Sequence, residues 1–169
     1  FKRGSARSVA VADGYAYVGA AQAGLMVVDV SDPSMPQYVS AIPELGWAHH
    51  VKLSGSYAYV ATLGGVEIVD ISHPRHPELV ASMNNFGRSI GLDVVGTTAY
   101  IADEYNGLQI YDVSIPSLPL FLGALNSFPA TGVKVQDNHA FIAATTNGMK
   151  IVDISDPAVA LLLEVDADL

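Results

Sequence analysis

The chain has 169 residues, of which half are hydrophobic and only 15% are charged, and its net charge is −9. The excess of negative charge disfavours binding to a nucleic-acid backbone, and no apolar run approaches the roughly 18 residues that a membrane-spanning helix needs. Cysteine is absent, which excludes disulfides, thiolate metal sites and a cysteine nucleophile. The chain begins at Phe1 and shows no signal peptide, so we expect either a mature form or a stretch of a longer protein.

The first 45 residues form a series of short strands and turns. Asp13-Gly14 is a hairpin signal, because a type I′ turn needs positive φ at both of its central residues. A proline-containing turn at 31–36 ends the most apolar strand, since proline cannot donate a hydrogen bond to a β-ladder. The expected strands cover residues 9–11, 15–18, 25–30 and 37–42.

The same pattern recurs three more times, with a period of 41 or 42 residues. Its markers are an aromatic residue followed by a β-branched one in the second strand, and an aspartate that closes the third strand. The pairs are Tyr17-Val18, Tyr59-Val60, Tyr100-Ile101 and Phe141-Ile142, and the aspartates are Asp29, Asp70, Asp112 and Asp153. Four strands in a period of this length are typical of one blade of a β-propeller. The rungs of a β-solenoid, the alternative, are usually shorter.

We therefore predict an all-β fold, a β-propeller built from four four-stranded blades of about 41–42 residues each. The chain is expected to be a single domain over 1–169, with blades near 7–46, 47–87, 88–129 and 130–169. A closed four-bladed ring is favoured. The alternatives are half of an eight-bladed ring, completed by a dimer or a longer chain, and an open array whose apolar end faces seek a partner.

The apolar runs that end in these aspartates resemble the LVIVD repeat, and the resemblance covers about residues 7–163. The segments that carry it are GLMVVDVSDPSMP, GVEIVDISHPRHP, GLQIYDVSIPSLP and GMKIVDISDPAVA. The resemblance implies a β-propeller of bacterial or archaeal surface proteins, and hence an extracellular or cell-surface location. It implies no single activity and no catalytic residue, because the recurring residues belong to the scaffold.

Residues that differ between the copies are the candidates for function. In a propeller, the first strand of each blade lies beside the central axis. The residues just before the first strands include one arginine, two histidines and a tryptophan in the first two copies, and one arginine in the third. These residues are Arg7, Trp47, His49, His50 and Arg88. We interpret them as a candidate site for an anionic or sugar-like ligand at the mouth of the axis. The alternative, that they are solvated loop residues, is favoured.

A second variable position lies inside the first strands. Lys52, Asp93 and Lys134 occupy it in successive copies, so the carboxylate is expected between two ammonium groups near the axis. Structural ion pairing is the favoured interpretation. The alternative is an acid–base pair of Asp93 with His49 or His50.

Other polar groups are assigned to the scaffold or to loops. The four recurring aspartates each precede a serine by two residues, which predicts side-chain capping of the turn that follows. His73 and His76 in a proline turn are expected to be exposed rather than metal ligands, and the oxygen-rich loop 103–106 is expected to be solvated rather than to bind calcium. No catalytic residue, metal or cofactor is predicted.

The sequence thus favours a non-enzymatic structural or protein-interaction module with a protein partner or self-association, and with no nucleic acid and no membrane insertion. Small-molecule or glycan binding stays open. The alternatives are a propeller hydrolase or lyase with its site at the axis, and a lectin-like module that uses Trp47.

Overall fold

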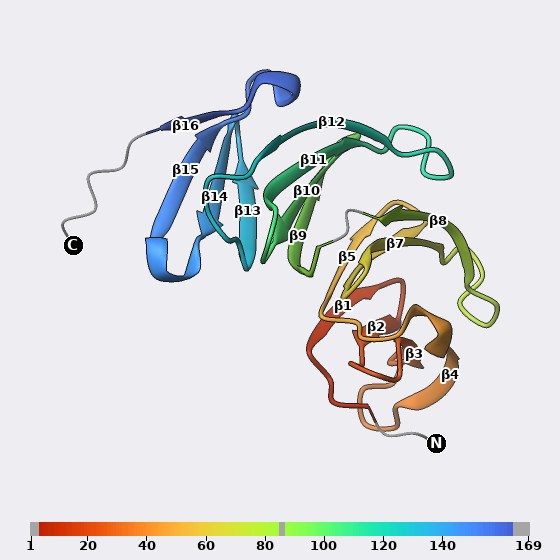
Figure 1. Ribbon diagram of the computed structural model, residues 1–169. Coiled ribbons are helices and arrows are strands. Elements are labelled where there is room, and N and C mark those ends of the chain that lie inside the picture. The colour runs from red at the N-terminus through yellow and green to blue at the C-terminus, as the bar shows by residue number, and fades with distance from the viewer. Residues whose placement is uncertain (1–3, 85–86, 164–169) are drawn as a thin grey trace.

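The computed structural model describes residues 4–84 and 87–163, which form four antiparallel sheets of four strands each (Figure 1). In every sheet the strands are adjacent in chain order. The first two sheets contain β1 (Ser8–Ala12), β2 (Tyr15–Gly19), β3 (Leu25–Asp29) and β4 (Gln37–Ile42), then β5 (His50–Ser54), β6 (Tyr57–Thr62), β7 (Gly65–Asp70) and β8 (Glu78–Asn84). The last two contain β9 (Ser89–Val95), β10 (Thr98–Asp103), β11 (Gly107–Asp112) and β12 (Leu120–Leu125), then β13 (Gly132–Gln136), β14 (His139–Ala143), β15 (Met149–Asp153) and β16 (Leu161–Leu163). The all-β prediction of four four-stranded units is confirmed.

The helices of the described residues are single 3₁₀ turns. They are η1 (Pro43–Leu45), η2 (Thr145–Asn147) and η3 (Pro157–Val159). None of the described helices is long and apolar enough to cross a membrane.

Turn chemistry agrees with the sequence. Asp13 and Gly14 have φ values of 51° and 79°, as the predicted hairpin requires. Each recurring aspartate accepts a hydrogen bond from the backbone amide of the serine two residues later, which confirms the capping role. The distances from the serine N to the aspartate Oδ1 are 3.0 Å for Asp29, 2.8 Å for Asp70, 2.7 Å for Asp112 and 2.9 Å for Asp153. Bonds from these serines hold the pKa of each carboxyl below its usual range.

Three apolar cores lie between successive sheets. In each, one face of a sheet contributes an aromatic residue and aliphatic residues from its second and third strands, and the next sheet contributes apolar residues mainly from its first and second strands. Tyr17, Leu25 and Val27 thus pack against Val51 and Val60, and the pattern repeats at the next two junctions. The apolar alternation of the repeats therefore serves contact between sheets, as it does between propeller blades.

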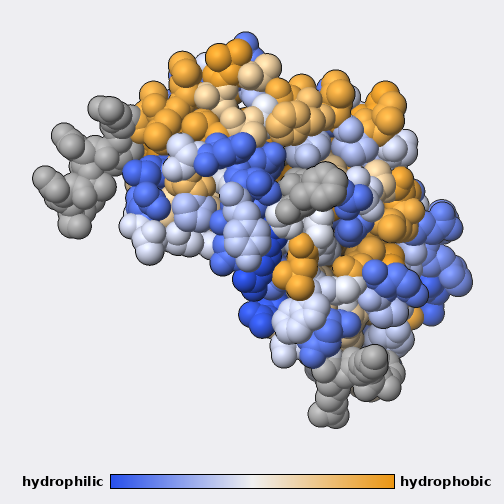
Figure 2. Space-filling model, viewed as in Figure 1, coloured by the Kyte–Doolittle hydropathy of each residue, from blue (hydrophilic) through white to orange (hydrophobic). Residues whose placement is uncertain are grey.

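The four sheets form an open arc (Figure 1). Contacts between sheets join the first to the second, the second to the third and the third to the fourth, and in the described residues the fourth sheet does not pack on the first. The closed four-bladed ring that the sequence favoured is therefore wrong for this chain, while a place in a larger assembly stays a prediction. Hydrophilic side chains gather on the concave side, and apolar side chains follow the convex edge over β12 and β16 (Figure 2).

Candidate functional site

The concave side of the arc is built from the first strand of each sheet. β1, β5, β9 and β13 lie along it in this order, each packed against the next. In β5, β9 and β13 the residue opposite the aromatic side chain of the second strand is charged. These cross-strand pairs are Lys52 with Tyr59, Asp93 with Tyr100, and Lys134 with Phe141, whereas β1 places Ala10 opposite Tyr17.

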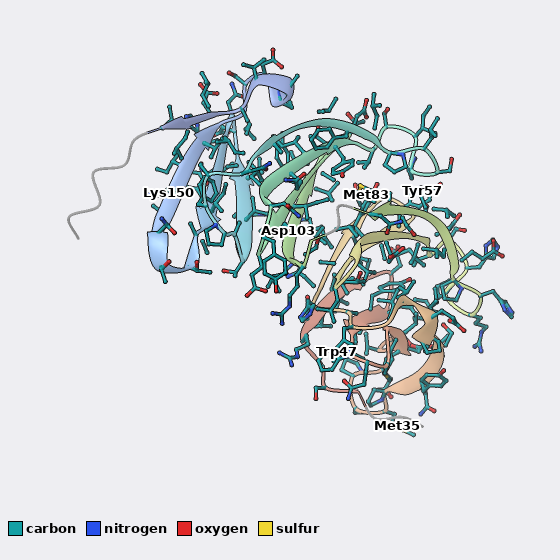
Figure 3. All side chains as sticks on the ribbon, in the orientation of Figure 1. Met35, Trp47, Tyr57, Met83, Asp103 and Lys150 are labelled. Atoms are coloured by element: carbon teal, nitrogen blue, oxygen red, sulfur yellow. The ribbon has the colours of Figure 1, made fainter. Side chains whose placement is uncertain are left out.

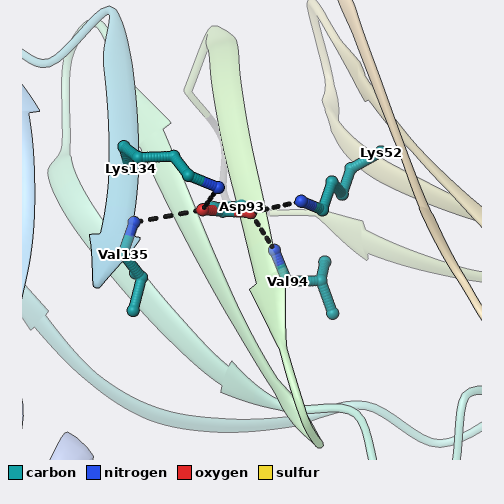
Figure 4. A network of polar contacts seen from close by, with 5 residues as sticks. All are labelled: Lys52, Asp93, Val94, Lys134 and Val135. Carbon is teal, nitrogen blue, oxygen red and sulfur yellow. Dashed lines mark hydrogen bonds and ion pairs between the residues drawn. The ribbon is translucent and has the colours of Figure 1, made fainter. Parts of the chain in front are cut away.

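Asp93 is the centre of a polar network that links three sheets (Figure 4). Lys52 Nζ lies 2.8 Å from Asp93 Oδ1, and Lys134 Nζ lies 2.7 Å from Oδ2. The backbone amides of Val94 and Val135 donate to the same two oxygens, each at 3.0 Å. The structure thus brings together the three residues for which the sequence predicted pairing.

The surroundings of Asp93 keep it ionised. Its side chain is only 2% exposed, and burial alone would raise its pKa, but the hydrogen bonds from Lys134, Lys52 and the Val135 amide outweigh burial and lower the pKa below the usual value. A carboxylate with both oxygens held by two donors each is suited to cross-linking the sheets. A general acid would instead need a raised pKa.

A second group of residues gathers where the chain enters the first three sheets. The guanidinium carbon of Arg7 lies 6.0 Å from the centroid of the Trp47 ring, and the rings of Trp47 and His49 lie 6.3 Å apart at 31°. Trp47, on the concave side beside the first sheet (Figure 3), is 41% exposed. We call these three residues, with Arg88 from the third sheet, the mouth cluster.

Arg88 joins the mouth cluster through charge. Burial lowers the pKa of His49, and the nearby Arg88 and Arg7 lower it further, while Glu104 partly opposes them. Arg88 Nη1 donates to Glu104 Oε2 at 2.7 Å. Within the described part of the chain, His49 Nε2 and Arg88 Nε are buried and have no hydrogen-bond partner. The mouth cluster therefore carries unused polar atoms beside two cations, an arrangement that suits an anionic or hydroxyl-bearing ligand.

His50 belongs to the other group. It begins β5 opposite Ala61, and its pKa is lowered mainly by burial, with Asp93 and Lys52 acting in opposite directions. Among the described residues, no hydrogen bond joins Asp93 to His49 or His50. The structure thus separates the five predicted mouth residues into four at the loops and one beside the ion pairs.

The loop 103–106 differs from the expectation of a solvated loop. Asp103 is fully buried, and its Oδ1 accepts the amides of Tyr105 at 2.9 Å and Asn106 at 2.7 Å. Glu104, which the sequence did not connect with the axis, is the partner of Arg88. Over residues 4–84 and 87–163, no cluster of three or more acidic or histidine side chains could hold a metal ion.

Solved structures with this arrangement of sheets include two designed proteins. The crystal structure of the computationally designed Ika4 protein matches 89% of this chain and 92% of its own, with a TM-score of 0.69 and 12% identity. That of the computationally designed Ika8 protein also gives a TM-score of 0.69, at 13% identity, over 89% of this chain, which spans only 46% of the Ika8 chain. These likenesses concern the fold alone.

Sequence comparison identifies the repeats. No curated protein matches the chain. The profile of the LVIVD repeat matches four times, at residues 3–42, 45–85, 87–127 and 129–165, so nearly the whole sequence is accounted for by the repeat. The chain therefore belongs to the LVIVD repeat family.

Proposed function

We propose that this chain is a non-enzymatic structural and protein-interaction module that acts at the prokaryotic cell surface or outside the cell. The observation that carries the proposal is the apolar outer edge of the third and fourth sheets, over β12 and β16 (Figure 2). Large apolar side chains on the fourth strands are half exposed or more: Leu120 at 62%, Phe121 at 51% and Leu161 at 60%. Exposed apolar edge strands are typical sites for pairing with another chain.

The concave side supports the same proposal, because the buried carboxylate on its first strands already has a full set of hydrogen-bond donors. Asp93 has four donors, and the recurring aspartates bind their own turns. These five carboxylates thus have structural uses that need no substrate. The surface location follows the resemblance of the repeats to those of bacterial and archaeal surface proteins.

The test is cross-linking on intact cells of the source organism. A photoreactive residue at Leu120 is expected to form a covalent product with a protein, and the product should disappear when the cells are first treated with external protease. The matched control carries the same group at Gln136, an exposed polar position on β13. No product at Leu120, or equal products at both positions, would argue against the proposal, and a protease-resistant product would argue against the surface location.

The mouth cluster supports a second candidate function, binding of an anionic or sugar-like ligand. The unpartnered atoms His49 Nε2 and Arg88 Nε favour it. A glycan array followed by titration is the measurement, with Trp47→Ala as the variant, since an indole supplies the stacking surface for a sugar ring. Binding that survives Trp47→Ala unchanged would contradict this role for Trp47.

A further inference from the structure

The first sheet exposes the residues that the other sheets bury. Val9 and Val11 on β1 are 61% and 63% exposed. Four of their six counterparts by strand register are nearly buried, with Val51 3% exposed, Leu92 3%, Val94 6% and Val135 7%, and the other two, Leu53 and Val133, are half-buried. These counterparts pack against the preceding sheet. The outer face of β1 is therefore one half of a junction of the kind that the chain builds three times.

The fourth sheet exposes the other half. Phe141, Ile151 and Met149 stand where the inner sheets place buried residues, for example Tyr100, Ile110 and Leu108. Met149 is 49% exposed, whereas its counterparts Leu25, Val66 and Leu108 are fully buried. A surface hollow of about 340 Å³ lies beside this face, lined by Phe141, Ile142, Ala143, Gly148 and Met149. The two end faces are thus the two different halves of one contact.

The proline turns at the outer edge show the same arrangement, in which each inner contact joins one sheet to the next and the end sheets leave one side uncovered. Ser40 Oγ on β4 donates to the carbonyl oxygen of Pro74 in the next sheet at 2.6 Å, and β12 likewise lies against η3, the proline turn of the fourth sheet. Pro74 and Pro157 are half-buried, whereas Pro33 of the first sheet is exposed. Among the described residues, no fourth strand covers the proline turn of the first sheet and no proline turn covers β16.

We propose that a second copy of this chain fills both vacant positions, with its first sheet against the fourth sheet of the other copy and the reverse. A twofold axis then relates two identical head-to-tail junctions, and the two arcs close into an eight-sheet ring. A second copy is the expected partner because its end faces match the two halves of the junctions already present within one chain. Each new junction would reproduce the existing contact, with Val9 and Val11 of one copy against Phe141 and Met149 of the other. A heterologous contact closes into a ring only if the rotation between successive sheets fits.

This inference deepens the proposed function by naming a partner, but it uses the end faces and not the outer edge. Sedimentation analysis of the purified chain is expected to give twice the chain mass of 17.7 kDa. The variant Val9→Lys/Val11→Lys should halve that mass while keeping the β-sheet circular dichroism signal, because both side chains are already exposed within one copy. The matched control Ile115→Lys/Leu118→Lys alters two similarly exposed residues in a proline turn, at 58% and 72%, and should stay dimeric.

Engineered disulfides test the register, because the chain has no cysteine of its own. A Cβ atom at Gly19 would lie 3.2 Å from Val51 Cγ2 across the first junction. Ala143 and Val9 are the corresponding residues at the proposed junction. A mixture of Val9→Cys and Ala143→Cys chains is therefore expected to form a disulfide-linked heterodimer far faster than either variant alone forms a homodimer.

A monomer, a filament, or cross-linking no faster in the mixture than in the single variants would overturn the proposed dimer. None of these results bears on the cross-linking at Leu120, so failure of the dimer and failure of the proposed function are distinguishable. A dimer that is split by the β1 variant, kept by the proline-turn control and captured in the mixture would establish it.

Discussion

The junction between the first and second sheets and the junctions on either side of β9 are held by different polar contacts. Beside β9, Asp93 draws lysines from both neighbouring sheets. At the first junction Ala10 stands at the same position, and neutral bonds replace the ion pairs: the Val51 amide donates to Ser8 Oγ at 3.2 Å, and Ala21 and Ala48 exchange backbone bonds of 3.2 and 3.1 Å. Buried apolar contacts are common to all three junctions. They therefore provide the general stabilisation between sheets, whereas the polar contacts differ from one junction to the next.

The largest expected effect tests these common apolar contacts. Leu25→Ala at the first junction and Leu108→Ala at the third should each lower the free energy of unfolding by about 2–5 kcal/mol, because both side chains are fully buried. Urea denaturation of both variants is the measurement. The control Leu118→Ala, at a 72% exposed position, should change stability by less than about 0.5 kcal/mol. A loss of unfolding free energy in only one of the two variants would show that the apolar contacts at the two junctions are not equivalent.

The next effect isolates the ionic junctions. Asp93→Ala should cost about 2–4 kcal/mol, since it leaves the buried Val135 amide without its acceptor and two lysines without their counterion. Lys134→Ala should cost at most about 1 kcal/mol, because that side chain is 70% exposed and solvent screens the pair. Equal losses for the two variants in urea denaturation would show that the buried carboxylate is not the centre of the network.

At acid pH, the stability difference between the wild type and a variant with a neutral side chain in place of Asp93 should be lost. Because its pKa is lower in the folded chain than in the unfolded chain, its contribution is fully present above the unfolded value of about 4 and is lost as the pH falls through the folded value. The gap in unfolding free energy between the wild type and Asp93→Asn should therefore be constant near neutral pH and narrow below about pH 4. A gap that stays constant into acid would contradict the lowered pKa.

The smallest effect concerns the neutral junction. Ser8→Ala should lower the free energy of unfolding by about 1 kcal/mol, because one neutral hydrogen bond to a backbone amide is lost. Thermal unfolding beside Asp93→Ala gives the comparison, with Ser117→Ala in an exposed turn as the control. A loss as large as that of Asp93→Ala would mean that neutral and ionic links are equivalent, and the contrast between the junctions would disappear.

Sequence reasoning succeeded where the repeats themselves supply the geometry. The alignment of copies placed Lys52, Asp93 and Lys134 at one position in successive sheets, and neighbouring sheets then bring that position together. It missed the Arg88–Glu104 pair and the burial of Asp103. Both lie beside a β-bulge between Ala102 and Asp103, where the register of β9 against β10 shifts, and no turn residue in the sequence indicates that bulge.

The sequence by itself determined the four units, the order of strands within each and the aspartate caps, because alternation and turn chemistry act within one repeat of about 41 residues. Only the tertiary structure decided that the arc stays open, that the mouth cluster separates from His50, and that Val9 and Val11 are left uncovered. The physical reason is that closure depends on the small rotation between neighbouring sheets, summed over three junctions. That rotation is set by side-chain packing between repeats, so it cannot be predicted from the sequence pattern within one repeat.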